Sequence, residues 1–239
     1  MAQMFEIFER YSNLLVAFSE KKDGNLKLGN NLKETAKENR EKFFRKLELK
    51  PEDVVSGGLV QGNRIAVVKE KDRGKIVLKT DGLITATKEI FLSVTAADCL
   101  PVFFYDPTSK VIAIAHAGWR GLAKDILQKV VRRMQREFQC RPMDILVGLG
   151  PAIGECHYDV QEDVAQEFKD FSSALLRRQE KTFLDLKKIA ALELQSVGVF
   201  GKNIEIHPAC TSCLKETYFS YRRDKPEKVQ AMLALIGFK

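Results

Sequence analysis

The chain has 239 residues, 45% of them hydrophobic and 30% charged, which is typical of a globular protein with a substantial core. Its net charge of +7 comes from small basic groups with acidic neighbours. This pattern does not indicate a nucleic-acid interface. It favours an ordinary solvated surface, and the alternative interpretation is a preference for small anionic ligands.

No apolar run approaches the roughly 18 residues that cross a bilayer, and the acidic N-terminal stretch does not resemble a signal peptide. The five cysteines are an odd number and follow no secretory signal. They therefore favour a reduced, cytoplasmic protein over a disulfide framework. We expect no membrane or nucleic-acid partner.

Apolar runs with β-branched residues and alternation predict strands. They lie at residues 14–18, 65–68, 76–78, 91–95, 102–105, 111–115, 145–148 and 204–207. Helical periodicity predicts helices at residues 35–47, 121–138, 161–168, 184–197 and 225–235, of which the second has the clearest apolar face. Strands and helices intermix without strict βαβ alternation. The fold class is therefore α/β (α+β), one domain over residues 1–239 with mixed β-sheets flanked by helices.

Residues 95–121 predict a β-hairpin with reactive side chains at its open end. A turn centred near Pro107 and Thr108 places Cys99 almost opposite His116. Cross-strand neighbours have Cβ atoms about 5 Å apart, so the thiol and the imidazole would lie side by side. Each residue alone is more often an inert core residue. Together they suggest either a metal site or a cysteine nucleophile with a histidine base.

The hairpin runs directly into a predicted helix through Gly118, Trp119 and Arg120. A helix start offers free amides to a phosphate or carboxylate, and Arg120 adds a forked donor. The alternatives are a surface ion pair for Arg120 and a core position for Trp119, which otherwise offers a stacking surface for a planar base.

Two further motifs give weaker signals. The segment 148–154 is a glycine-containing loop after a predicted strand, without a P-loop or dinucleotide pattern. Cys210 and Cys213 have the spacing of a metal or redox pair. Because no second such pair exists, we favour structural thiols here.

Taken together, these motifs resemble the YfiH family, also called the laccase-domain or polyphenol oxidase family, over nearly the whole chain. The matching segments are DGLIT at 81–85, ADCLP at 97–101, HAGWRG at 116–121, LGPAIG at 149–154 with YDV at 158–160, CT at 210–211 and FSYRR at 219–223.

The resemblance implies a cytoplasmic purine nucleoside phosphorylase that cleaves adenosine, inosine, guanosine or methylthioadenosine with phosphate and also deaminates adenosine. It implies a zinc ion held by two histidines and one cysteine. Cys99 and His116 match two of these ligands. Gln61 occupies the position of the other histidine, in LVQGN at 59–63.

The Gln61 difference leaves three interpretations open. In the first, zinc binds more weakly through Cys99, His116 and the Gln61 oxygen. In the second, His157 replaces the missing ligand, whereas His207 resembles a strand-end residue. In the third, the chain has become a binding protein. The segment 224–228 also departs from the family's threonine-glycine-arginine pattern, which removes one expected anion contact.

The leading prediction assigns catalysis to Cys99, His116, Arg120 and Gln61 and substrate contacts to Gly118, Trp119 and Arg222, in a monomer or homodimer. The alternatives are a cysteine hydrolase that edits peptidoglycan precursors, as some members of the family are associated with doing, and a catalytically degenerate nucleoside-binding protein. Three histidines in the whole chain argue against a multicopper centre.

Overall fold

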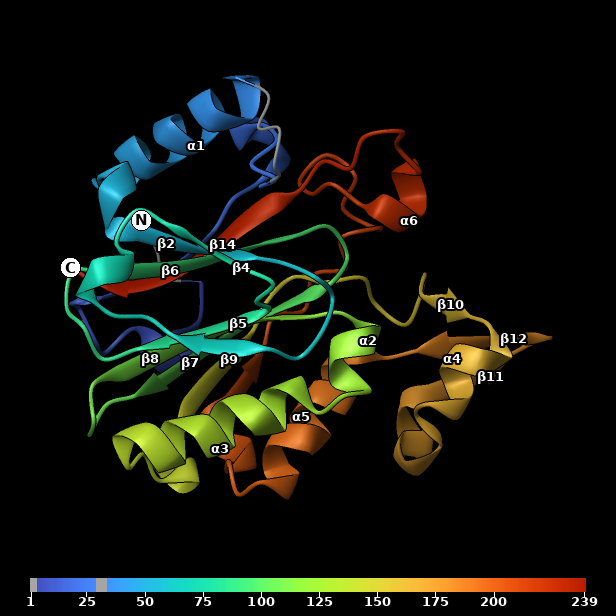
Figure 1. The fold of residues 1–239 in the computed structure, drawn as a ribbon. Helices are drawn as coiled ribbons and strands as arrows, with labels where there is room; N and C mark the ends of the chain where they lie inside the picture. Colours follow the sequence, from blue (N-terminus) through green and yellow to red (C-terminus); the bar gives the residue numbers. More distant parts are fainter. Residues whose placement is uncertain (1–3, 29–33) are drawn as a thin grey trace.

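The computed structural model describes residues 4–28 and 34–239. Two large sheets lie face to face, and each outer face is covered by helices, so the layers follow the order helix, sheet, sheet, helix (Figure 1). None of the described helices combines the length and the apolar character needed to cross a membrane.

The first large sheet has the strand order β1-β14-β6-β2-β4. These strands are Leu14–Phe18, Met232–Phe238, Phe91–Ala96, Val54–Gly58 and Ile76–Leu78. Helix α1 (Glu34–Lys46) covers its outer face (Figure 1), where Phe43 and Phe44 pack with Leu233 and Leu235.

The second large sheet has the order β13-β9-β7-β8-β5-β3. Its strands are Ile204–Ile206, Leu146–Leu149, Leu100–Asp106, Val111–Ala117, Gly82–Thr85 and Ile65–Val67. Helices α3 (Ile126–Phe138) and α5 (Leu186–Ser196) cover its outer face.

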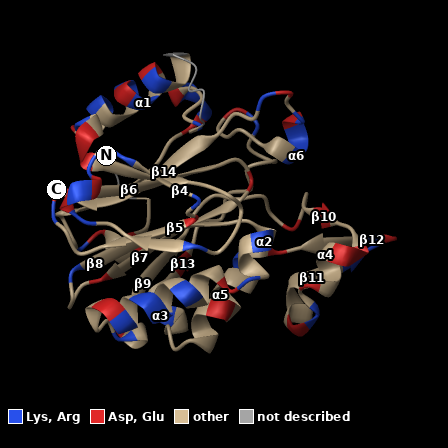
Figure 2. Cartoon of the chain, in the orientation of Figure 1, with Lys and Arg blue, Asp and Glu red and all other residues tan. Residues whose placement is uncertain are grey.

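Alternation along the hairpin strands divides the core in two. Phe103 and Ile114 face the first sheet, whereas Phe104 and Ala113 face the helices. Both faces are buried, which explains why these strands are continuous apolar runs. Charged side chains are concentrated on helices and loops (Figure 2).

A small third sheet, β10-β12-β11, projects to one side together with α4 (Figure 1). Its strands are Asp159–Val160, Lys181–Leu184 and Leu175–Arg178, and α4 spans Glu162–Gln166. Two one-turn helices, α2 (Trp119–Leu122) and α6 (Tyr221–Asp224), lie on the side of the large sheets that faces it.

The α/β class with mixed sheets and helical cover is confirmed, and all eight predicted strands form within one or two residues. The predicted helix at 225–235 is wrong. Its last four residues belong to β14, which is fully buried between β1 and β6. Helix-forming Ala, Met and Leu residues misled the prediction, because the tertiary position of β14 overrides local propensity.

The predicted helix at 121–138 is also interrupted. Asp125 has a φ of 58°, in the left-handed region, and separates α2 from α3. The helix after Trp119 is therefore a single turn, and its dipole supports an anion site much less than a long helix would.

Candidate active site

The hairpin brings Cys99 and His116 to the same face, with a register different from the predicted one. Pro101, not Cys99, is opposite His116, because the turn is centred one residue later than predicted. A two-residue offset preserves the face, so Cys99 is a diagonal neighbour of His116. A Cβ atom added to Gly118 would lie 2.9 Å from Cys99 Sγ and 3.9 Å from His116 Cε1. The thiol and the imidazole therefore meet over this glycine.

Asp81 lies behind the imidazole, at the start of β5, and is completely buried. Its Oδ1 is 3.4 Å from His116 Nδ1, an ion-pair distance without hydrogen-bond geometry. The same carboxylate accepts hydrogen bonds from the N–H groups of Gln61 and Gly62, each 2.9 Å long. Burial opposes its ionisation, but His116 and the Gly62 amide hold the Asp81 pKa below its usual value. Asp81 is the first residue of the DGLIT motif, and the sequence alone gives no indication of this role.

The electrostatics of this triad favour a charged imidazole. Burial alone lowers the pKa of His116, but the interactions of the imidazole with Cys99 and Asp81 outweigh it and raise the pKa to about 10. Since Nδ1 faces Asp81, the other ring nitrogen, Nε2, is left for Cys99 or for a substrate. The arrangement places a thiol beside an imidazole that a carboxylate orients.

The predicted residues Gln61 and Arg120 are brought together at the rim of this site. Arg120 donates a 3.3 Å hydrogen bond from Nη1 to Gln61 Oε1, and its guanidinium stacks 4.3 Å from the Trp119 ring. Trp119 itself is half-buried and packs on the core of the second sheet. The rim therefore presents one exposed cation beside one aromatic surface.

Arg222 reaches the site from the C-terminal segment. Its Nη1 donates to the side chain and the carbonyl of Asp159, at 2.8 and 2.7 Å, and its guanidinium lies 5.1 Å from the centre of the Tyr158 ring. Burial and the nearby Cys99 raise the pKa of Tyr158, whereas Arg222 and Arg120 oppose the shift. Tyr158 therefore lies among the thiol and both arginines, a placement that sequence analysis missed.

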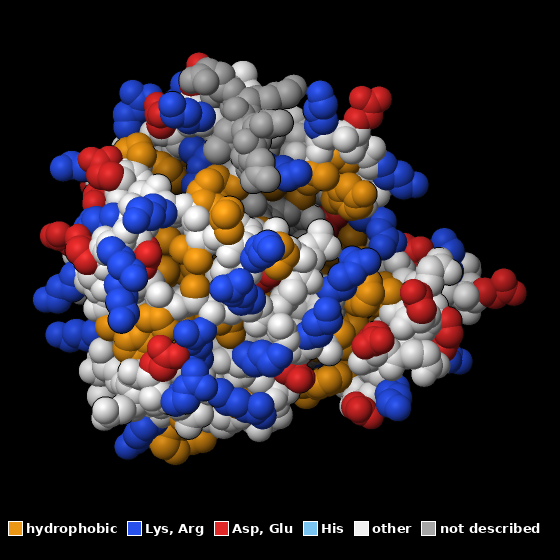
Figure 3. Space-filling view, viewed as in Figure 1, with side chains coloured by type: hydrophobic (Ala, Val, Ile, Leu, Met, Phe, Trp, Pro, Cys, Tyr) orange, Lys and Arg blue, Asp and Glu red, His pale blue; other side chains and the backbone are white. Residues whose placement is uncertain are grey.

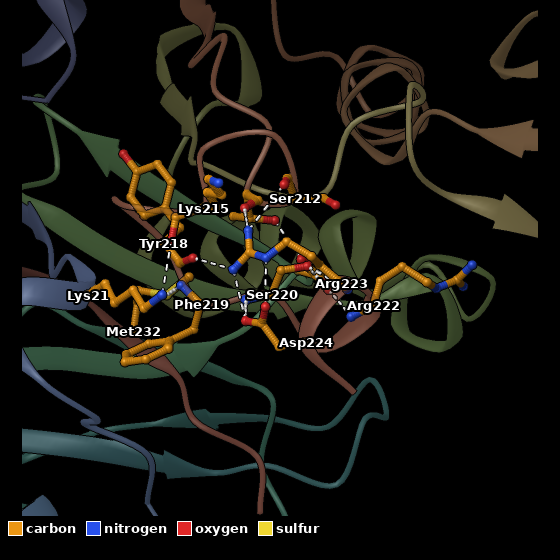
Figure 4. A network of polar contacts seen from close by, with 12 residues as sticks. Lys21, Ser212, Lys215, Tyr218, Phe219, Ser220, Arg222, Arg223, Asp224 and Met232 are labelled. Carbon is orange, nitrogen blue, oxygen red and sulfur yellow. Dashed lines mark hydrogen bonds and ion pairs between the residues drawn. The ribbon is translucent and has the colours of Figure 1, made fainter. Parts of the chain in front are cut away.

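The neighbouring Arg223 has a different role. Its guanidinium binds the carbonyls of Thr211, Ser212 and Tyr218 as well as the Asp224 carboxylate (Figure 4). The Arg222 side chain points away from this network (Figure 4). Of the two adjacent arginines, Arg223 therefore holds the loop and Arg222 is directed toward the site.

The residues around Cys99 and His116 do not make a strong three-ligand zinc site. A thiolate and an imidazole backed by a carboxylate suit zinc. Within the described ranges, however, no further Cys, His, Asp or Glu joins them in a metal-sized group. The Gln61 Oε1 atom is a weak, neutral metal ligand, and it already accepts a hydrogen bond from Arg120.

A second cluster of metal-ligating side chains does exist. Cys156, His157, Cys210 and Cys213 place one donor atom each within 4.8 Å of one another, a group that could bind a metal ion. His157 thus has three thiols as neighbours. The spacing of Cys210 and Cys213 gave no indication of Cys156 and His157, which lie more than fifty residues earlier in the chain.

The fold and the site define a mixed α/β protein in which a partly buried Cys99 lies beside the buried His116 and Asp81, beneath two arginines. The chain belongs to the family described as "multi-copper polyphenol oxidoreductase laccase", whose model matches residues 17–239.

Curated relatives have purine nucleoside phosphorylase names. Purine nucleoside phosphorylase YlmD of Bacillus subtilis is 34% identical over 189 residues, covering 74% of this chain and 68% of that protein. Purine nucleoside phosphorylase YfiH of Escherichia coli is 37% identical over 173 residues, covering 65% and 68%.

Solved structures agree with the fold. YlmD of Geobacillus stearothermophilus superposes with a TM-score of 0.91 at 30% identity, covering 97% of this chain and 94% of that one. The hypothetical protein YfiH of Bacillus licheniformis gives a TM-score of 0.90 at 31% identity, covering 97% and 95%.

Proposed function

We propose that this chain is a purine nucleoside phosphorylase acting on adenosine, inosine, guanosine or methylthioadenosine. We propose further that it works in the cytoplasm as a monomer or homodimer, on small molecules rather than on nucleic acid or membranes. The observation that carries the proposal is the convergence of Arg120, Arg222 and Tyr158 on the Cys99–His116 pair. The names of the relatives indicate the same chemistry.

The two arginines provide what the phosphate requires. Phosphorolysis needs a phosphate oxygen placed next to C1′ of the nucleoside, and a guanidinium holds a phosphate with two parallel hydrogen bonds. Arg120 is exposed, and among the described residues its guanidinium hydrogen-bonds only the Gln61 amide, so a phosphate that binds there replaces one hydrogen bond. Lys and Arg side chains gather across the middle of the face in Figure 3, which favours the approach of anions.

The Cys–His–Asp group stabilises the leaving base. As the C1′–N9 bond breaks, its electron pair moves to the purine while the C1′–O bond to phosphate forms. A proton or hydrogen bond from His116 Nε2 stabilises the negative charge on the purine, and Asp81 keeps the imidazole charged and oriented. Trp119 and Tyr158 offer aromatic surfaces to the base.

Adenosine deamination is the finer part of the proposal. It requires an activated water at C6 of the purine, and the absence of an imidazole at position 61 affects this step most. We therefore expect deamination to be weaker than phosphorolysis in this chain.

The test incubates the protein with each nucleoside and phosphate and separates the products by chromatography. We expect free base and ribose 1-phosphate only when phosphate is present, and loss of both in Cys99→Ala. Cys140→Ala is the matched control, because Cys140 lies at the turn end of the hairpin beside Asp106. Product without phosphate, or ligand-induced thermal stabilisation without turnover, would contradict the proposal; the second result would indicate a nucleoside-binding protein.

A second candidate is a hydrolase with Cys99 as nucleophile, acting on peptidoglycan precursors. The arrangement Cys99–His116–Asp81 favours it, since a thiolate activated by an oriented histidine is the usual form of such an enzyme. Fast alkylation of Cys99 at neutral pH, with hydrolysis of an acylated precursor and no phosphorolysis, would select this function.

A further inference from the structure

The cluster of Cys156, His157, Cys210 and Cys213 lies outside the active site and has no part in the proposed reaction. We propose that it is a structural zinc site with three thiolate ligands and one imidazole ligand. The site is independent of the Cys99–His116 pair, so it stands or fails separately from the proposed function.

The spacing of the donors matches a tetrahedron of zinc ligands. Typical Zn–S and Zn–N bonds of about 2.3 and 2.0 Å give ligand–ligand edges of roughly 3.5 to 3.8 Å. The Cys156 and Cys213 sulfurs are 3.6 Å apart. His157 Nδ1 lies 3.2 Å from the Cys156 sulfur, 3.4 Å from that of Cys213 and 4.0 Å from that of Cys210. One ion of this size is within reach of all four donors.

Two backbone turns hold the donors in this arrangement. The first turn, 154–157, closes with a hydrogen bond from the His157 N–H to the Gly154 carbonyl. The second, 210–214, closes from the Leu214 N–H to the Cys210 carbonyl. A parallel bridge between Ala152 and Cys210 joins them. The Gly154 N–H also donates to Cys210 Sγ over 3.2 Å, a contact that stabilises a thiolate.

The composition of the cluster favours a metal over a disulfide. A disulfide between any two of the thiols would bring their sulfurs to about 2.0 Å and leave the third thiol and the imidazole unused. Three sulfurs and one imidazole nitrogen are a complete ligand set for a closed zinc site. Cys156 and Cys213 are also exposed, and a bound ion would protect both from oxidation.

The zinc site would also stabilise the loops that support the active site. Thr211, between two of the ligands, donates a 2.6 Å hydrogen bond to Asp98, which directly precedes Cys99. The Ile153 N–H donates to the Asp98 carbonyl from the other side. Zinc would therefore fix both loops against the turn that carries the Cys99 thiol.

The first test counts metal by mass spectrometry in the native protein and in variants, all purified with zinc present. Cys213→Ser and His157→Ala should each lose about one zinc per chain relative to native, whereas Cys140→Ser and Cys99→Ala should keep it. Equal zinc in the native protein and in Cys213→Ser and His157→Ala would overturn the proposal.

The second test uses cobalt on the native chain, so that it holds even if a variant does not fold. Metal-free protein reconstituted with Co²⁺ should give the strong sulfur-to-cobalt absorption and visible bands of a tetrahedral site with three thiolates, and Cys99→Ala should keep this spectrum. A weak octahedral spectrum, or a disulfide among Cys156, Cys210 and Cys213 in freshly purified protein, would refute the site.

Discussion

The absence of a side chain at Gly118 determines how closely the Cys99 thiol and the His116 imidazole approach each other. Its φ of −79° suits any residue, so the glycine is needed for space rather than for backbone freedom. Gly118→Ala should displace the Cys99 thiol, because the new methyl group would lie 2.9 Å from Sγ. We expect at least a tenfold loss of kcat/KM with a small change in thermal stability.

Gly62→Ala is the control for this prediction, since its methyl group would lie at an ordinary 3.5 Å from Asp81 Oδ2. It should retain most of the activity. Full activity in Gly118→Ala would show that the position of the thiol does not matter to the reaction.

Gln61 is the residue at which this chain differs from the family pattern. Its φ of 57° lies in the left-handed region, which histidine tolerates better than most residues. Gln61→His should therefore keep the fold, add the missing imidazole and bind about one zinc per chain more than the native protein. Gln128→His, on α3, adds an imidazole away from the site and should bind no extra zinc. If Gln61→His gains no zinc, position 61 does not face the Cys99–His116 pair.

For helices and strands, burial in the tertiary structure determines the secondary structure where the local sequence is ambiguous. Most strands were predictable because apolar runs with turn signals mark them directly. Strand β14 was not, because Met232–Phe238 consists largely of residues that also suit a helix. The offset of the hairpin had a similar origin, since the polar residue Asp106 pairs with Val111 and lengthens β7 beyond its apolar run. The metal cluster depends on two distant loops, which no local pattern connects.

Helix α5 carries a buried carboxyl group that predicts a pH effect on stability. Glu193 is completely buried, and its carboxyl oxygens have no hydrogen-bond partner in the described part of the chain. Burial raises its pKa to about 9, with Asp125 adding to the shift. The folded protein thus keeps a proton that the unfolded chain releases above about pH 4.5. Stability should fall as pH rises from about 4.5 to 9, by up to about 1.4 kcal/mol per pH unit from this group.

Glu193→Gln removes this titration. Its free energy of unfolding, measured with urea, should exceed that of the native protein by a margin that grows between pH 5 and 8. Glu167→Gln, at an exposed position, should follow the native curve. A constant difference between Glu193→Gln and native at all pH values would contradict the buried, protonated carboxyl group.

In the molecule as a whole, one buried carboxylate joins two distant parts of the chain. Asp98 belongs to the turn between β6 and β7, and its oxygens accept hydrogen bonds from the hydroxyls of Thr211 and Ser220 and from the N–H of Arg222, at 2.6, 3.0 and 2.7 Å. It thereby holds the loop 209–224 against the hairpin that carries Cys99. The sequence placed Asp98 in a family motif but gave no indication of this role, since its partners lie more than a hundred residues away.

Asp98→Asn replaces one acceptor oxygen with a donor amide that must face a hydroxyl or an N–H group. Each hydrogen bond to a charged group contributes about 1.5–3 kcal/mol, so we expect the unfolding free energy to fall by about 2–4 kcal/mol. Asp106→Asn is the control. Asp106 is also buried, and its Oδ1 accepts hydrogen bonds from the Thr108 and Ser109 N–H groups, an oxygen that asparagine keeps. If the two variants lose the same unfolding free energy, Asp98 does not join the segments. If Asp98→Asn alone also speeds amide hydrogen exchange in the loop 209–224, the Asp98 carboxylate is what couples the C-terminal part of the chain to its reactive thiol.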